Sequence, residues 1–308
     1  MTTLRPYLFL LLTVVIFAGN ILVGKALSDL PPFTLSFGRV SIALCLMLPI
    51  GAHQARRDWP LFRRHWKPLV GLSLTGVAFF NALIYLALGY TSPTNVSILE
   101  SLIPVVTLLF SVLLLGERPR GRQWLGVVLS LAGAMAVISL GSDSGPGLAG
   151  VNGGDAVMLL AVLIWVGYSL LVKSHMAKFP RYGGLLVMLV IATAVMGPIA
   201  WVENLLRPEP LTLTGEQWLG LAYLGVFPSV VALLLYNSAI GDVGPSQAAV
   251  FLNLLPVFTM LGAWWLLGEV ILPAQILGSL VVIAGVLLTT LRARRTSSQP
   301  ARAPGKRS

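Results

Sequence analysis

One apolar stretch of helix length, residues 93–117, occurs twice in the chain. The second copy, residues 245–269, lies 152 positions later. The alignment pairs Pro93 with Pro245, Pro104 with Pro256, Thr107 with Thr259, Gly116 with Gly268 and Glu117 with Glu269. A proline inside a helix releases the carbonyl four residues earlier, and hydrocarbon offers no water to satisfy that carbonyl. We therefore predict interrupted helices beside a cavity, with Pro104 and Pro256 as hinges.

The composition places both stretches in a membrane. Of 308 residues, 56% are hydrophobic and 10% are charged, and the mean hydropathy is +0.86. A membrane span needs about 20 mostly apolar residues. Ten such runs occur, at residues 6–27, 33–51, 67–89, 93–115, 121–140, 153–173, 181–203, 216–240, 245–267 and 273–292. This predicts an all-α, polytopic membrane protein with ten transmembrane helices. The first run is long and lacks a small-x-small cleavage site, so we interpret it as a span rather than a signal peptide.

The duplication extends well beyond the first stretch. Trp66 aligns with Trp218 at the same offset, and Pro49 aligns with Pro198 at an offset of 149. We predict a first five-helix repeat at residues 1–141, a periplasmic glycine-rich linker at 142–152, a second repeat at 153–292 and a disordered basic tail at 293–308. Five is an odd number, so the second repeat must cross the membrane in the opposite direction. Inverted repeats of this kind build the central cavities of many secondary transporters.

The net charge of +10 reflects orientation rather than a nucleic-acid partner. With a cytoplasmic N-terminus, 18 of the 21 Lys and Arg residues fall on the cytoplasmic side, two fall outside, and Arg39 falls within the second span. This is the positive-inside asymmetry of membrane proteins. It predicts that both termini are cytoplasmic and that the lipid bilayer, not nucleic acid, is the partner of the basic residues.

The sequence resembles the EamA-type members of the drug/metabolite transporter superfamily. The resemblance is carried by the ten-span inverted repeat, the proline-interrupted fourth span that ends in L-L-L-G-E, and the G-x(6)-G spacing of Gly126 and Gly133. It covers nearly the whole chain. It implies ten helices around a central cavity, in a bacterial inner (cell) membrane, that export small metabolites by alternating access. Within the superfamily the chain is most similar to exporters of aromatic and other neutral amino acids.

Glu100 is the first candidate for the site. A charged group at mid-span costs roughly 3 kcal/mol on insertion scales, so it normally has a partner or a task. The carboxyl either carries a proton, anchors a substrate ammonium, or is hydrogen-bonded within its own half. Ser101 and Asn253 occupy equivalent positions of the two copies. Each either caps a carbonyl freed by the nearby proline or contacts the substrate.

The other candidates are polar or aromatic residues at mid-span. They are Asn20 in the first span, Asn81 and Tyr85 in the third, Trp165 and Tyr168 in the sixth, and Tyr236 and Asn237 in the eighth. Trp165 either packs in the core or forms an aromatic wall over a ligand. The amides and hydroxyls either line the cavity or join neighbouring helices. Arg39 lies only several residues into its span, and its favoured interpretation is a snorkelling side chain.

Several function classes are disfavoured by missing motifs. The sequence has no G-x-x-x-x-G-K-[ST] run, and its three histidines lack metal-ligand spacing. An integral-membrane enzyme is the weaker alternative, and a channel would need rings of like charge. With Glu100 as the deep charge, we expect a zwitterionic, neutral or cationic small-molecule substrate, and cationic drug efflux stays open. We expect no cofactor and no metal, proton coupling through Glu100, and either a monomer or a homodimer.

Overall fold

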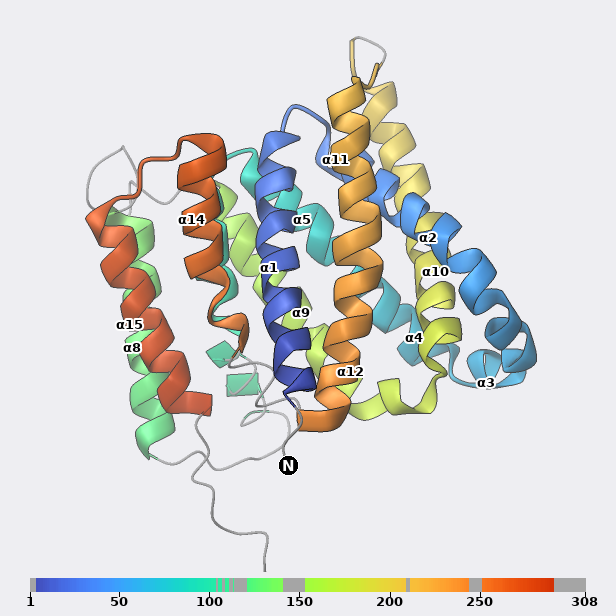
Figure 1. Ribbon diagram of the computed structural model, residues 1–308, viewed down its shortest axis with the longest axis horizontal. Helices are drawn as coiled ribbons and strands as arrows, with labels where there is room; N and C mark the ends of the chain where they lie inside the picture. The colour runs from blue at the N-terminus through green and yellow to red at the C-terminus, as the bar shows by residue number, and fades with distance from the viewer. Residues whose placement is uncertain are drawn as a thin grey trace, which may run out of the picture.

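The computed structural model describes residues 4–103, 105–106, 109–110, 113, 121–140, 153–208, 211–243 and 251–290, and the elements in these ranges are helices (Figure 1). The first half contains α1 (Arg5–Ala26), α2 (Pro32–Arg57), α3 (Trp59–Arg64), α4 (Trp66–Leu72), η1 (Ser73–Phe79), α5 (Phe80–Leu88), α6 (Pro93–Glu100) and α8 (Gly121–Leu140). The second half contains α9 (Gly153–His175), η3 (Met176–Lys178), α10 (Arg181–Leu205), α11 (Gly215–Val226), η4 (Phe227–Ala232), α12 (Leu233–Val243), α14 (Leu255–Leu267) and α15 (Pro273–Thr290).

Six helices in the described ranges are long and apolar enough to cross a membrane. They are Arg5–Ala26, Pro32–Arg57, Trp66–Leu88, Gly153–Val172, Arg181–Leu205 and Gly215–Tyr236. Shorter apolar stretches lie within α8, α14 and α15. The predicted class, an all-α polytopic membrane protein, is confirmed. The count of ten spans and the division into two inverted repeats stay predictions.

Prolines and glycines mark where the helices begin and end. Pro32 and Pro93 are the first residues of α2 and α6, where a missing N–H costs nothing because it would have no intrahelical partner. Gly268 ends α14 with a φ of 65°, a left-handed conformation that favours glycine. This conformation explains the glycine of the G-E motif in the second copy.

The helices pack in pairs that follow the repeat. Extensive contacts join α2 to α10 and α8 to α15, and α5 packs on α9 as α12 packs on α1. In Figure 1, α8 and α15 lie side by side at one edge of the molecule and α2 and α10 at the other. A Cβ atom added to Gly285 would lie 2.6 Å from the backbone oxygen of Gly126, so glycine at this position allows α15 to pack closely on α8.

A chain of polar contacts joins the two halves where α5 meets α6. The Thr91 hydroxyl donates to the Asp155 carboxylate at 2.8 Å. The Gln275 side-chain amide donates to the Asn95 side-chain carbonyl at 2.9 Å, and the Lys25 ammonium donates to the backbone oxygen of Leu88 at 2.7 Å. These contacts tie α9 to the turn before α6, α15 to α6 itself and α1 to the end of α5.

Candidate functional site

Two π-helical segments interrupt the spans that line the centre of the molecule. They are η1 and η4, and they overlap when the two copies are aligned 152 positions apart. In η4, Pro228 has no N–H to give to the carbonyl of Leu224, and the hydroxyl of Ser229 donates to that carbonyl at 2.7 Å instead. The segment is therefore satisfied without water, as a span requires. Widened turns of this type are frequent at functional sites.

The segment η1 lets an aromatic side chain approach its backbone. A Cβ atom on Gly76 would overlap the ring of Tyr168, so only glycine leaves space for that ring. Gly76 and Pro228 occupy equivalent positions of the two copies. The two π-helical segments thus face the same central region with different residues, a glycine in η1 and a proline in η4.

Arg39 lies at the centre of this region. Its side chain is only 3% exposed, and its Nε donates to the Ser229 hydroxyl at 3.0 Å. Its Nη1 donates to the side-chain carbonyls of Asn20 (3.1 Å) and Asn81 and to the Tyr85 hydroxyl (2.6 Å). These acceptors come from α1, α5 and η4, so Arg39 connects both halves. The predicted snorkelling of Arg39 is wrong because these acceptors satisfy its donors inside the bundle. The expectation that Glu100 is the only deep charge is wrong for the same reason.

Arg39 and Glu100 line one cavity, which we call the central cavity. Its other lining residues include Phe17, Asn20, Phe80, Asn81, Trp165 and Ser229. Its volume is about 30 Å³. These residues give the central cavity both signs of charge, two amides and several rings.

Glu100 ends α6, and it lines the central cavity. No group in the described ranges hydrogen-bonds or ion-pairs with its carboxylate. Within these ranges, the Glu100 carboxyl is therefore not hydrogen-bonded within its own half, which was one of the predicted alternatives. An uncompensated carboxyl in a span is expensive, which marks Glu100 as a functional candidate.

A second cavity of about 20 Å³ lies on the other side of Glu100. Ser101 and Asn253 line it together with Phe17 and Trp165. The Ser101 hydroxyl donates to the backbone oxygen of Ser97 at 3.0 Å, so it does not cap the carbonyl of Glu100 that the proline would release. Both polar atoms of the Asn253 amide are buried and make no hydrogen bond within the described ranges. Asn253 is thus available to a ligand or a water molecule.

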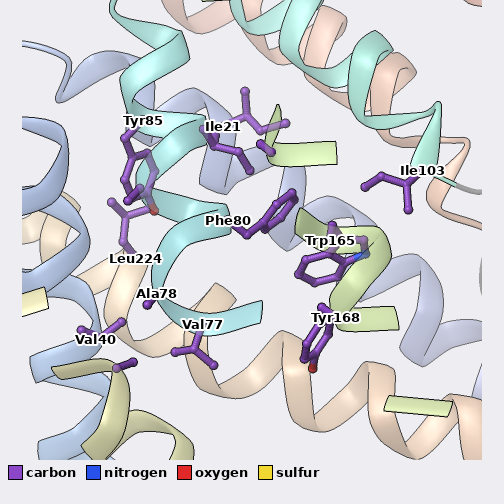
Figure 2. Packing of buried hydrophobic residues seen from close by; sticks show 14 of the residues in the cluster. Ile21, Val40, Val77, Ala78, Phe80, Tyr85, Ile103, Trp165, Tyr168 and Leu224 are labelled. Atoms are coloured by element: carbon purple, nitrogen blue, oxygen red, sulfur yellow. The ribbon is translucent and has the colours of Figure 1, made fainter. Parts of the chain in front are cut away.

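Aromatic rings form one wall of the central cavity. The Trp165 ring lies 4.3 Å from the Phe80 ring and 4.8 Å from the Tyr168 ring, centroid to centroid. Figure 2 shows Trp165 on α9 between Phe80 on α5 and Tyr168 on α9. The indole of Trp165 packs in the core, as one of the two alternatives predicted, and it also lines both cavities. That it forms a wall over a ligand stays a prediction.

The remaining predicted site residues either do not line the two cavities or lie outside the described residues. The Tyr85 hydroxyl accepts a hydrogen bond from Arg39, and the Tyr168 ring packs against the Trp165 ring. Neither tyrosine is among the residues that line the two cavities. Tyr236 packs near Leu10 instead, beside Phe9 and Phe251. Pro104 and the side chain of Asn237 lie outside the described residues.

Pro256 occupies the second position of α14, not the interior of a helix. Residues 253–254 form a turn, so the span is interrupted as predicted, but Pro256 begins the helix after the break. A proline in the first turn removes no intrahelical hydrogen bond. The hinge function of Pro256 stays a prediction.

Sequence reasoning missed Arg39, Phe80 and Ser229. The signal for Arg39 was present, because a charged residue within a span is a functional candidate by the same rule that selected Glu100. Phe80 and Ser229 carried no such signal. Their position depends on the widened turns of η1 and η4, and neither turn has a pattern in the sequence.

Comparisons with known proteins agree with this architecture. The EamA-like transporter family matches the chain twice, at residues 4–139 and 152–291. An uncharacterized transporter of Archaeoglobus fulgidus is 29% identical over 94% of this chain and 98% of its own length. The uncharacterized inner membrane transporter YedA of Escherichia coli K12 is 26% identical over 89% of this chain and 86% of its own.

Two further similarities extend over almost the full length. An uncharacterized protein of Pseudomonas aeruginosa, PA1977, is 30% identical over 92% of this chain and 94% of its own. A crystal structure superposes with a TM-score of 0.66 at 20% identity, covering 96% of this chain and 99% of the other, which supports the fold alone. The paired family match, the apolar helices and the buried charged cavity lead to one conclusion. The chain is a multi-pass membrane transporter that belongs to the EamA-like transporter family.

Proposed function

We propose that this transporter exports neutral and aromatic amino acids across a bacterial inner membrane by alternating access. One observation carries the proposal: the central cavity combines Arg39, Glu100 and the aromatic wall of Phe80 and Trp165. An amino acid of this class has a carboxylate, an ammonium and an apolar side chain. Small-molecule sites commonly pair an apolar lining with a few placed polar groups, and this cavity has that composition.

The alternatives fit the same cavity less well. A simple organic cation would find a partner in Glu100 but would be repelled by the guanidinium of Arg39. An acidic amino acid carries an additional carboxylate that Glu100 would repel, by roughly 4 kcal/mol at 4 Å and an effective dielectric near 20. Neither problem arises for a ligand that carries one charge of each sign.

The position of the central cavity supports a moving site. Asn20 and Asn81 of the first half and Trp165 and Ser229 of the second half line it, so a movement of the two halves against each other would open and close it. The polar contacts that join the two halves near α6 lie at one end of these helices. Opening and closing at alternate ends is the motion expected of repeat transporters.

Uptake into proteoliposomes tests the proposal. The full-length chain is reconstituted, and accumulation of labelled phenylalanine is measured with and without a pH gradient. We expect accumulation of unchanged phenylalanine and competition by leucine and alanine, but weak competition by aspartate and by an organic cation such as tetraphenylphosphonium. Equal competition by aspartate and phenylalanine at neutral pH would refute the cavity assignment, and uptake of the cation alone would favour drug efflux.

The direction of export depends on the orientation of the chain. The distribution of Lys and Arg predicts both termini in the cytoplasm. A reporter fused after Ser308 that works only in the cytoplasm should be active, and one that works only in the periplasm should be silent. The opposite result would reverse the orientation.

A further inference from the structure

We propose that Arg39 binds the carboxylate of the substrate, so that a free carboxylate is required for recognition. The inference rests on the proposed function and makes it more specific, because it assigns one group of the ligand to one side chain. It also separates amino acids from their amides and from the amines that lack a carboxyl group.

The hydrogen bonds of Arg39 leave one part of its guanidinium unused. Nε and Nη1 donate to side-chain oxygens on α1, α5 and η4. Nη2 donates to no group in the described ranges, although Arg39 lines the central cavity. Acceptors on three elements hold the guanidinium in one orientation, and the two N–H bonds of Nη2 are left for a ligand.

Among the described residues, no carboxylate forms an ion pair with Arg39. Its acceptors are amides and hydroxyls, which satisfy hydrogen bonds but carry no formal charge. The ion pair found among the described residues joins Arg57 to Asp58 in the turn between α2 and α3, far along the chain from the cavity. Arginine does not lose its proton in proteins, and a buried charge requires a counter-charge. An anion that enters the central cavity supplies it.

Glu100 determines the orientation of the ligand in the central cavity. It lines the same cavity as Arg39, yet the two side chains form no ion pair within 4.0 Å. A molecule between them can place a carboxylate at Nη2 and an ammonium at the carboxyl of Glu100. Charge-assisted hydrogen bonds of this kind are about twice as strong as neutral ones. The side chain of the ligand then points toward Phe80 and Trp165.

A series of phenylalanine analogues tests the assignment in reconstituted, full-length protein. Each analogue is added as a competitor of labelled phenylalanine uptake. The competitors are phenylalanine, phenylalaninamide, phenethylamine and 3-phenylpropanoate. We expect phenylalanine to compete at least about tenfold better than the amide or the amine, because each lacks the charged acceptor. Comparable competition by phenethylamine, in protein that still accumulates phenylalanine, would overturn this assignment and leave the proposed function intact. Absence of any phenylalanine uptake would overturn both.

Three variants sharpen the result. Measured in counterflow of labelled phenylalanine, the preference for phenylalanine over the amide should disappear in Arg39→Gln, whereas Glu100→Gln, at the opposite charge of the same cavity, should keep it. Arg207→Gln, in the loop after α10, is the surface control and should change neither. If Arg39→Gln does not fold, Arg39→Lys keeps the charge and should keep the preference at reduced affinity. If folded Arg39→Gln still prefers phenylalanine over the amide, the proposal is refuted and Arg39 has a structural role.

Discussion

The two halves of the molecule share their helix arrangement but contribute opposite chemistry to its centre. At four aligned positions the first half has polar residues and the second half has apolar or aromatic ones. The pairs are Asn20 and Tyr168, Arg39 and Met188, Asn81 and Leu233, and Glu100 and Leu252. The paired packing of α2 on α10 and of α8 on α15 follows the repeat all the same. The two halves have therefore kept their packing while their site chemistry has diverged.

The difference suits a ligand with two unlike ends. If both copies had kept the same cavity residues, the site would offer two equivalent orientations to any substrate. A carboxylate and an ammonium need unlike partners, and the first half supplies both, in Arg39 and Glu100. The second half supplies a rigid aromatic surface in Trp165 and a supporting hydroxyl in Ser229.

The largest effect is expected at Glu100 and not at its counterpart Leu252. Glu100→Gln should abolish accumulation driven by a pH gradient while substrate counterflow persists, because glutamine keeps the shape but cannot exchange a proton. Leu252→Met should keep both activities. The measurement is paired uptake and counterflow in proteoliposomes. Full pH-driven accumulation by Glu100→Gln would remove this carboxyl from the coupling mechanism, and failure of both modes would assign it to substrate binding alone.

The next effect compares Arg39 with Met188. Arg39→Met gives the first half the residue of the second. It leaves the oxygens of Asn81 and Ser229 without the Arg39 donor, whereas the Tyr85 hydroxyl still donates to Asn20 at 2.9 Å. We expect a loss of about 3 kcal/mol in the free energy of unfolding. Met188→Leu conserves volume in a buried site and should cost less than about 1.5 kcal/mol. Unfolding of the purified protein in detergent measures both, and similar losses would contradict the central position of Arg39.

A smaller effect separates Trp165 from Phe17, its aligned partner in the first span. Trp165→Ala removes a ring that contacts both Phe80 and Tyr168. Competition by phenylalanine should weaken about tenfold and competition by alanine about twofold, since only phenylalanine loses a stacking partner. Phe17→Ala should show a weaker difference between the two substrates. Equal weakening for both amino acids in Trp165→Ala would indicate a collapsed helix contact.

The smallest effect concerns the hydroxyl of Ser229. Ser229→Ala removes the donor to Leu224 and the acceptor for Arg39, and we expect a cost of about 1 kcal/mol in unfolding free energy. Ser174→Ala removes a similar bond to the carbonyl of Leu170 at the exposed end of α9, and it should cost less than about 0.5 kcal/mol. Thermal unfolding in detergent compares the two. A cost at Ser174 as large as at Ser229 would show that the π-helical segment has no special need of its hydroxyl.

The sequence was sufficient for the helical membrane class and for part of the site. Apolar runs and the duplicated stretch predicted where helices lie, and intramembrane polarity selected Asn20, Asn81 and Glu100, which line the central cavity. It was insufficient for Arg39 and Tyr236. Whether a long side chain turns to the membrane surface or into the bundle depends on acceptors that neighbouring spans bring close. Periodicity within one span contains no information about those neighbours.

The π-helical segments have a consequence for how these two copies can vary. One residue corresponds to a rotation of about 100° in an α-helix, so a single deletion within η1 would turn Asn81 and Tyr85 away from the Arg39 guanidinium. The same deletion in η4 would remove Ser229 from that guanidinium. Substitutions at these turns change one contact, whereas deletions change the whole face of a span. The widened turns therefore restrict insertions and deletions at mid-span, and both copies are expected to keep the same length between their flanking spans.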